Sequence, residues 1–429
     1  MKTLILALES SFTMFVKTKL PKRWAYFAEV ASYLKSKGHD IDVMDCLNPA
    51  ISHGEVLQKI AENDYDLIIL LARPETARSI IKLSPFIKQI SSKSKVLIYG
   101  DVTNYFPNFF KNDFIDAIIV SGDWECGLDD YFDFLQGKKS VDQLEGISCN
   151  TGDGWTEGKP GRLFDGKDWV FPDISTEGFI DKELYFSIDE QLTITVSRGC
   201  PFNCTFCPAV ITFGSNDRRM PVAKVVEYIK ENKGKFKVLK LFSPTFTFNA
   251  EWVKALCKLM IDSDCIVPWT CTSRPDCLED LEMIELMAKA GCKRVAIGIE
   301  TLDKESGQGL KKFRNMDDYI DLVKKVFSDL IKVGIEPKPL MMLGLKGQTR
   351  KNVEASFDLL KSFGAKDIRA ASYSPRQLLR SKDADGSLDI DQIERMDKMT
   401  YQHIELPGIN REEYLRLIYN TNSYKDILK

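Results

Sequence analysis

The sequence has no long hydrophobic run and no excess of charge of either sign. A helix that crosses a bilayer needs about 20 consecutive apolar residues, and no segment approaches that length. Lysine and arginine together number 59 against 62 acidic residues, so nucleic acid is disfavoured as a partner. The apolar residues 3–8 are too few for a signal peptide, and no cleavage site of small residues follows them. We therefore expect a cytoplasmic protein without a membrane span.

Several common binding motifs are also absent. No G-x-G-x-x-G follows the first predicted strand and no P-loop occurs, which disfavours a nicotinamide or nucleoside triphosphate site. The three histidines, His39, His53 and His403, all lie outside a D-x-H-x-x-G pattern. The eleven cysteines are an odd number in an ordinary composition. They suit a reducing compartment better than a disulfide framework.

The alternation of apolar and amphipathic segments predicts an α/β protein with two domains. Residues 1–136 alternate short apolar runs with helical patterns, which indicates a doubly wound parallel sheet. Its ligand crevice should lie at the carboxyl ends of the strands, in the loops 9–23, 72–75, 100–108 and 121–127. The strands are predicted at 3–8, 41–44, 67–71, 96–99 and 117–120.

A second and more regular series of strands and helices occupies residues 191–375, after a linker at 137–190 that contains a hairpin. Six strand–helix units predict a partial (β/α)6 barrel that is open on one side, with its active site at the carboxyl strand ends. Residues 376–429 are predicted to form a helical cap over the open side. The barrel strands are predicted at 192–197, 238–243, 267–273, 294–300, 338–345 and 368–374.

Three cysteines at C-x3-C-x2-C spacing, Cys200, Cys204 and Cys207, follow the first barrel strand. Structural zinc normally takes four protein ligands, and no second cysteine or histidine pair follows at a suitable distance. A redox dithiol needs only two cysteines. An iron–sulfur cluster with three protein ligands accounts for all three and leaves one iron open.

The segment 200–207 resembles the cluster loop of the radical S-adenosylmethionine (SAM) superfamily, and the chain as a whole resembles members with an N-terminal cobalamin-binding-type domain. Residues 1–136 would then be a Rossmann-like domain and residues 191–375 a partial TIM barrel. The supporting segments are residues 218–220, 242–249, 296–300 and 342–349.

The resemblance implies that a [4Fe-4S] cluster cleaves SAM reductively, giving a 5′-deoxyadenosyl radical that abstracts hydrogen from the substrate. SAM would chelate the open iron, which places its sulfonium beside the electron donor. Phe206 would pack on adenine and Glu300 would accept hydrogen bonds from the ribose. The alternatives are loop packing for Phe206 and an ion pair for Glu300.

Four other residues occupy positions that bind SAM in similar proteins. Ser243 and Thr245 would lie near its amino group, although acidic residues are usual there. Arg274 would meet the SAM carboxylate or a substrate acid, or else form a structural salt bridge. Gly344 would allow close backbone approach, or simply form a turn.

Two radical reactions remain open as the function of the chain, together with one function that is not catalytic. The favoured function is cobalamin-dependent methylation of an unactivated carbon. The alternative is a dehydratase, epimerase or rearrangement enzyme with a vestigial first domain, because the loops at 72–75 and 101–106 are bulkier than expected around a corrin. A non-catalytic metal-binding protein is the third. The expected partners are a small-molecule substrate, such as a natural-product or cofactor intermediate, and an electron donor such as flavodoxin or ferredoxin.

Overall fold

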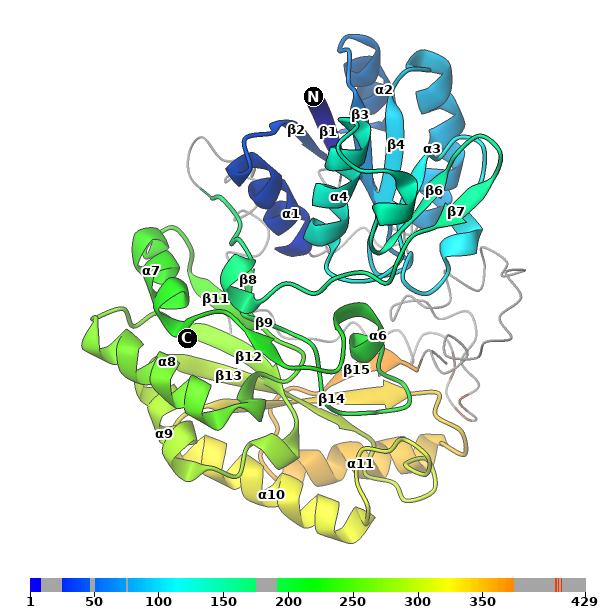
Figure 1. Ribbon diagram of the computed structural model, residues 1–429. Coiled ribbons are helices and arrows are strands. Elements are labelled where there is room, and N and C mark those ends of the chain that lie inside the picture. The colour runs from blue at the N-terminus through cyan, green and yellow to red at the C-terminus, as the bar shows by residue number, and fades with distance from the viewer. Residues whose placement is uncertain are drawn as a thin grey trace. The chain divides into compact units, whose positions relative to one another are not determined.

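The computed structural model of the chain describes residues 1–8, 25–46, 51–74, 76–174 and 191–373, with Leu406, Gly408 and Asn410. These residues belong to two compact units (Figure 1). The first unit contains the described residues up to 174 together with Ile211–Gly214, and the second contains the others up to 373. The loop predicted at 9–23 and nearly all of the predicted cap at 376–429 lie outside the described residues.

The first unit is built on a seven-stranded sheet. Its strands are β1 (Lys2–Ala7), β2 (Asp40–Asp45), β3 (Leu67–Leu71), β4 (Lys95–Tyr99), β5 (Ala117–Ile119), β6 (Ile147–Asn150) and β7 (Trp155–Glu157). They lie in the order β2-β1-β3-β4-β5-β6-β7. The first five are parallel, so the strand order reverses between β1 and β3, where a doubly wound sheet has its crevice. The hairpin predicted near 149–154 is β6–β7, and it extends this sheet in the antiparallel sense.

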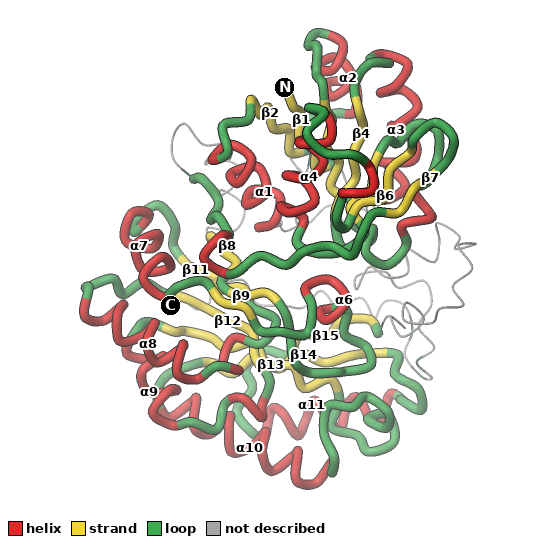
Figure 2. Tube along the Cα trace, in the orientation of Figure 1, coloured by secondary structure: helices red, strands yellow, loops and turns green. Residues whose placement is uncertain are grey.

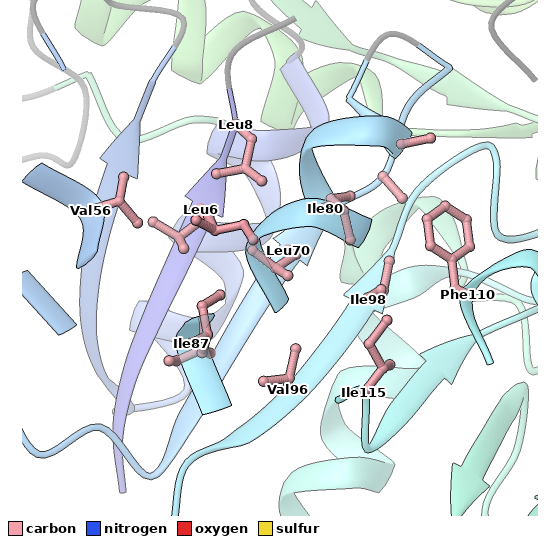
Figure 3. Packing of buried hydrophobic residues seen from close by; sticks show 14 of the residues in the cluster. Leu6, Leu8, Val56, Leu70, Ile80, Ile87, Val96, Ile98, Phe110 and Ile115 are labelled. Carbon is pink, nitrogen blue, oxygen red and sulfur yellow. The ribbon is translucent and has the colours of Figure 1, made fainter. Parts of the chain in front are cut away.

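Helices cover this sheet and bury its aliphatic side chains. On one face, Leu6, Leu70 and Ile98 belong to the same buried cluster as Val56 and Ile80 from the helices (Figure 3). α1 and α4 pack together, and so do α2 and α3. The helices are α1 (Ala25–Ser36), α2 (His53–Ala61), α3 (Ala77–Ile90) and α4 (Trp124–Leu135), with short turns η2 (Pro107–Phe110), η3 (Val141–Gln143) and η4 (Gly166–Asp168).

The second unit contains a six-stranded parallel sheet in the order β15-β14-β13-β12-β11-β8. Neighbours in the chain are neighbours in the sheet, as in a barrel of strands and helices, and the sheet stops at β8 and β15 as a half-barrel. Leu239 pairs with Leu192 on one side and Trp269 on the other. The strands are β8 (Gln191–Thr195), β11 (Val238–Phe242), β12 (Trp269–Ser273), β13 (Cys292–Glu300), β14 (Glu336–Leu343) and β15 (Arg369–Ser372).

Helices connect these parallel strands, and Figure 2 shows the alternation of strand and helix along the unit. Because the strands are parallel, the loops at 196–208, 243–249, 274–280, 301–315 and 344–349 all leave the same edge of the sheet. Among the described residues, no helix combines the length and apolar character that crossing a membrane requires. The helices are α6 (Ala209–Phe213), α7 (Val222–Asn232), α8 (Ala250–Asp262), α9 (Leu281–Lys289), α10 (Met316–Lys332) and α11 (Arg350–Ser362), with turns η5 (Phe246–Phe248) and η6 (Pro275–Cys277).

Candidate active site

The three predicted cluster ligands lie on the loop that leaves the first strand of the half-barrel sheet. A two-residue strand, β9 (Ser197–Arg198), precedes them and pairs with β10 (Arg218–Arg219). Cys200 and Cys204 are buried, Cys207 is half-buried, and all three are free thiols. Within the described ranges, no three His, Cys, Asp or Glu side chains are grouped tightly enough to hold a single metal ion. An iron–sulfur cluster takes thiolate ligands, each on a different iron, so the chemistry of these three side chains fits such a cluster.

The loop is fastened to the segment that follows β13. The backbone N–H of Thr205 donates to the carbonyl of Leu310 at 3.2 Å. The Thr205 hydroxyl donates to the carbonyl of Gly309 at 2.9 Å. Phe206 packs with Leu310 and Leu345 in a small apolar cluster that also includes Cys204. These contacts hold the loop against the segment that follows β13.

The surroundings of the thiols are apolar but not uncharged. Burial raises the pKa of Cys200 and of Cys204 above the ordinary value of a thiol. The positive charges of Lys312 and Arg274 oppose that rise at Cys204. Thiolates are the form that binds iron, so these two cations favour the metal-binding state of a buried sulfur.

Arg274 touches the cysteine loop directly, where a SAM or substrate carboxylate had been predicted as its partner. It follows β12 and is 8% exposed. Its Nη1 donates to the Sγ of Cys204 at 3.0 Å. Its Nε and Nη2 donate to the two carboxylate oxygens of Asp276 at 2.8 and 2.7 Å. The structural salt bridge considered from the sequence is therefore present, and it positions the guanidinium against a cluster ligand.

Glu300 forms an ion pair in this structure. It ends β13 at a register shift of the strand pairing and has a positive φ of 70°. The Nζ of Lys312 donates to its Oε1 at 2.8 Å, and both side chains are buried. The same Nζ lies 5.9 Å from the ring centroid of Phe206. The proposed ribose acceptor and adenine platform thus both lie close to one lysine, and a ribose would have to share or replace that ion pair.

Ser243 and Thr245, predicted near the SAM amino group, lie after β11 and are both buried. The hydroxyls of Ser243 and Ser197 are 2.5 Å apart and hydrogen-bonded. The Thr245 hydroxyl is 3.8 Å from the Sγ of Cys200. Both residues border the cysteine loop, and a role in binding SAM stays a prediction.

Gly344 begins the turn after β14 with a φ of 89°. Its N–H donates to the Oε1 of Gln348 at 2.8 Å, and the Nε2 of Gln348 donates to the carbonyl of Met342 at 3.0 Å. The side chain of Gln348 thus organises the turn that carries Leu345 to the cysteine loop. Close approach of a ligand to Gly344 stays a prediction.

The sequence interpretation missed Lys312, Asp276 and Phe202 as parts of this site. Lys312 lies in an irregular loop, where no periodicity marks it. Asp276 stands two residues after Arg274, and this short acid–base spacing is the one available signal. Cys277, in the turn η6 after β12, is half-buried, and burial raises the pKa of its thiol to about 12.

In the first unit, three polar side chains on or directly before the predicted cofactor loops have no hydrogen-bond partner among the described residues. They are the hydroxyl of Tyr99, the amide of Asn104 and the indole N–H of Trp124. The rings of Tyr99 and Trp124 lie edge to face with centroids 5.7 Å apart. Buried polar groups are nearly always bonded, so these atoms fit a bound polar group at the carboxyl end of β4 and the start of α4.

The loops after β3 and β4 are close to each other as well as bulky. Gly100 has a φ of 144°, and a Cβ at that position would collide with the carbonyl oxygen of Ala72. Tyr26 packs on Trp124 with ring centroids 5.1 Å apart. Aromatic side chains thus pack against one another in this region of the first unit.

Comparison with known proteins finds a family model that matches most of the second unit. A model of the radical SAM superfamily matches residues 194–360. An uncharacterised methyltransferase of Pyrococcus horikoshii is 23% identical over 352 residues, which span 81% of this chain and 74% of the relative. The anaerobic magnesium-protoporphyrin IX monomethyl ester cyclase of Rubrivivax gelatinosus is 24% identical over 82% of this chain, which spans 64% of that enzyme.

The fold also resembles a solved structure. The radical SAM methyltransferase TsrM from Kitasatospora setae, determined with cobalamin and a [4Fe-4S] cluster bound, superposes with a TM-score of 0.73 at 16% sequence identity. The superposition covers 87% of this chain and 72% of TsrM. The segment that matches the radical SAM superfamily model contains the cysteine loop together with Arg274, Glu300 and Gly344.

Proposed function

We propose that this protein is a radical SAM enzyme that uses a [4Fe-4S] cluster held by Cys200, Cys204 and Cys207 to cleave SAM, and that it methylates an unactivated carbon of a small molecule with the help of cobalamin. The observation that carries the proposal is the cysteine loop itself. Two buried thiols and one half-buried thiol lie at the carboxyl edge of a parallel half-barrel sheet. That edge is where barrel enzymes have their active sites.

The residues of this chain would hold and orient SAM. When bound, the reduced cluster supplies the electron that breaks a carbon–sulfur bond of SAM. Phe206 would pack on adenine, and Glu300 would accept hydrogen bonds from the ribose. Because Arg274 is paired with Asp276 and Lys312 with Glu300, a SAM carboxylate would have to displace one of these carboxylates to reach a cation.

Cobalamin belongs to the proposal for the first unit. TsrM was solved with cobalamin bound, and Tyr99, Asn104 and Trp124 offer buried polar atoms that a bound group would satisfy. The corresponding division of the chain assigns residues 1–136 to a Rossmann-like cobalamin-binding-type domain and residues 191–375 to a partial TIM barrel. A low-potential electron donor such as flavodoxin or ferredoxin, and a cytoplasmic location, complete the proposal. The free state of all eleven cysteines supports that location.

A second function is favoured by the aromatic side chains of the first unit. Tyr26, Tyr99 and Trp124 pack together at its carboxyl strand ends. A chain whose crevice is filled in this way would carry out a radical dehydration, epimerisation or rearrangement without cobalamin.

Two measurements test these functions. Anaerobically reconstituted protein is incubated with dithionite and SAM, and the products are separated by chromatography. We expect 5′-deoxyadenosine, and the absence of any nucleoside product would overturn the radical assignment.

The visible spectrum of protein purified from cells fed hydroxocobalamin tests the cobalamin assignment. We expect corrin absorbance that co-purifies in proportion to the chain. Protein free of that absorbance would remove the methyltransferase and leave the cobalamin-independent function.

A further inference from the structure

The guanidinium of Arg274 is fully engaged by the protein around it. Besides the bonds to Cys204 and Asp276, its Nη2 donates to the carbonyl of Lys312 at 3.0 Å. Its central carbon lies 3.9 Å from the ring centroid of Phe202, two residues before Cys204. One side chain therefore contacts the cysteine loop at a sulfur and at a ring, and also the segment after β13 that fastens the loop.

This arrangement leaves little of Arg274 for a ligand. A guanidinium has five N–H donors, and four hydrogen bonds from Arg274 to protein atoms are present. The remaining N–H lies on Nη1, the nitrogen that already donates to the Sγ of Cys204. Binding of a SAM or substrate carboxylate in the forked geometry that makes arginine effective would require breaking the Asp276 pair.

The charges around Cys204 are unevenly solvated. The side chain of Arg274 is 9% exposed, whereas that of its counter-ion Asp276 is 38% exposed. Water therefore screens the carboxylate more than the guanidinium, and the guanidinium is the group in contact with sulfur. The sulfur thus experiences a net positive field from this pair.

Such a field acts on the one redox step that the proposed function requires. Reduction of the cluster from the [4Fe-4S]2+ to the [4Fe-4S]+ state takes one electron from a low-potential one-electron donor and moves no proton. It adds a negative charge, which a nearby cation and an N–H···S hydrogen bond both stabilise.

We propose that Arg274 is a positioning residue that holds the Cys204 thiolate in place and raises the reduction potential of the cluster, with Asp276 setting how strongly it does so. This inference rests on the cluster assigned under the proposed function, but not on cobalamin or on the identity of the substrate. Arg274 would then bind the sulfur of Cys204 rather than the carboxylate of SAM or of a substrate.

The test is a potentiometric titration of the reconstituted cluster without SAM, followed by electron paramagnetic resonance. Arg274→Gln removes the charge, and Asp276→Asn removes the counter-charge while leaving the guanidinium on Cys204. Arg274→Gln should lower the reduction potential of the cluster by about 59 mV. At the potential where half of the wild-type cluster is reduced, the ratio of reduced to oxidised cluster in this variant should therefore be about tenfold lower, because one electron is transferred. Asp276→Asn should raise the ratio, by a smaller factor.

Two further variants separate charge from loop geometry. Arg274→Lys keeps the charge but cannot form the fork, so it should stay nearer the wild-type potential than Arg274→Gln does. Arg314→Gln and Glu279→Gln make the same charge changes at exposed positions nearby, and they should leave the potential unchanged.

The outcomes distinguish this inference from the proposed function. Wild-type protein that binds no cluster removes the cluster assignment and both proposals with it. A loaded wild type whose potential is unaffected by Arg274→Gln overturns the inference alone. A shift of Asp276→Asn in the same direction as Arg274→Gln would also overturn it, because loop distortion rather than charge would then explain both. If Arg274→Gln binds no cluster, the direction in which Asp276→Asn shifts the reduction potential tests the inference by itself.

Discussion

Cys204 connects more of the site than the other two cysteines, because its sulfur receives the guanidinium of Arg274 and packs beside Phe206. We expect Cys204→Ala to abolish cluster loading, with iron per chain near zero and no iron–sulfur charge-transfer absorption. Cys265→Ala is the matched control, because Cys265 is also buried and its thiol, among the described residues, donates to the carbonyl of Val226 rather than contacting the cysteine loop. Retention of the absorption in Cys204→Ala would contradict the assignment of this ligand.

The buried pair of Glu300 and Lys312 gives a second prediction at the scale of single residues. Lys312→Met leaves the Glu300 carboxylate buried without its partner, which should lower the free energy of unfolding by about 3–5 kcal/mol. Adding Glu300→Gln should recover much of that loss, because no isolated charge then remains buried. Urea unfolding of the wild type, both single variants and the double variant measures the coupling. A double variant no more stable than Lys312→Met would show that the two side chains do not act as a pair.

At the scale of elements, helix α9 begins directly after the turn that carries Arg274 and Asp276. Asp280 caps it by accepting a hydrogen bond from the N–H of Met283 at 3.0 Å, and this bond and Lys254 hold the pKa of Asp280 below its ordinary value of 3.8. We expect Asp280→Ala to lower the free energy of unfolding by about 1 kcal/mol and Asp280→Asn, which keeps a cap, by less.

The lowered pKa of Asp280 also fixes the direction of the pH effect. A carboxyl group with a depressed pKa in the folded state stabilises the fold above its ordinary pKa of 3.8, and this contribution is lost as the pH falls through the lower folded value. The difference in stability between wild type and Asp280→Ala should therefore be constant near neutral pH and shrink below about 3.8. Urea unfolding at a series of pH values checks this, and a difference that grew in acid would contradict it.

Much of the element order could be predicted because strand and helix periodicities are local properties of a sequence. The runs 67–71 and 238–243 became β3 and β11 within one residue at either end. The pairing of β6 with β5 is not local, so a hairpin assigned to a linker from its turn residues lies in a sheet. The cysteine spacing identified the loop, whereas Lys312, which lies 105 positions after Cys207 in an irregular segment, carries no pattern that would place it there. The hydrogen bond from Arg274 to the sulfur of Cys204 depends on side-chain geometry, which the spacing of residues in the sequence does not predict.

At the scale of the whole molecule, each unit has its own sheet and buried core, so the chain should unfold in two calorimetric transitions. Leu70→Ala in the core of the first unit should lower the free energy of unfolding of that unit by about 2–5 kcal/mol. Only one of the two transitions should then move to a lower temperature, and this identifies it as the unfolding of the first unit.

A ligand stabilises the unit that binds it, by about 2.7 kcal/mol at a hundred times its dissociation constant. Hydroxocobalamin should therefore raise the transition that Leu70→Ala lowers, and SAM with the cluster should raise the other. Both ligands acting on the same transition would contradict the proposed division of the chain.

The backbone at Glu300 has one more consequence, for attempts to stabilise the protein. A non-glycine residue at a φ of 70° stores strain of about 1–3 kcal/mol, which glycine would release. A search for thermostable variants based on backbone geometry alone would therefore select glycine at position 300. Such a variant would discard the carboxylate that pairs with Lys312, and it would leave the position proposed to bind the ribose without an acceptor.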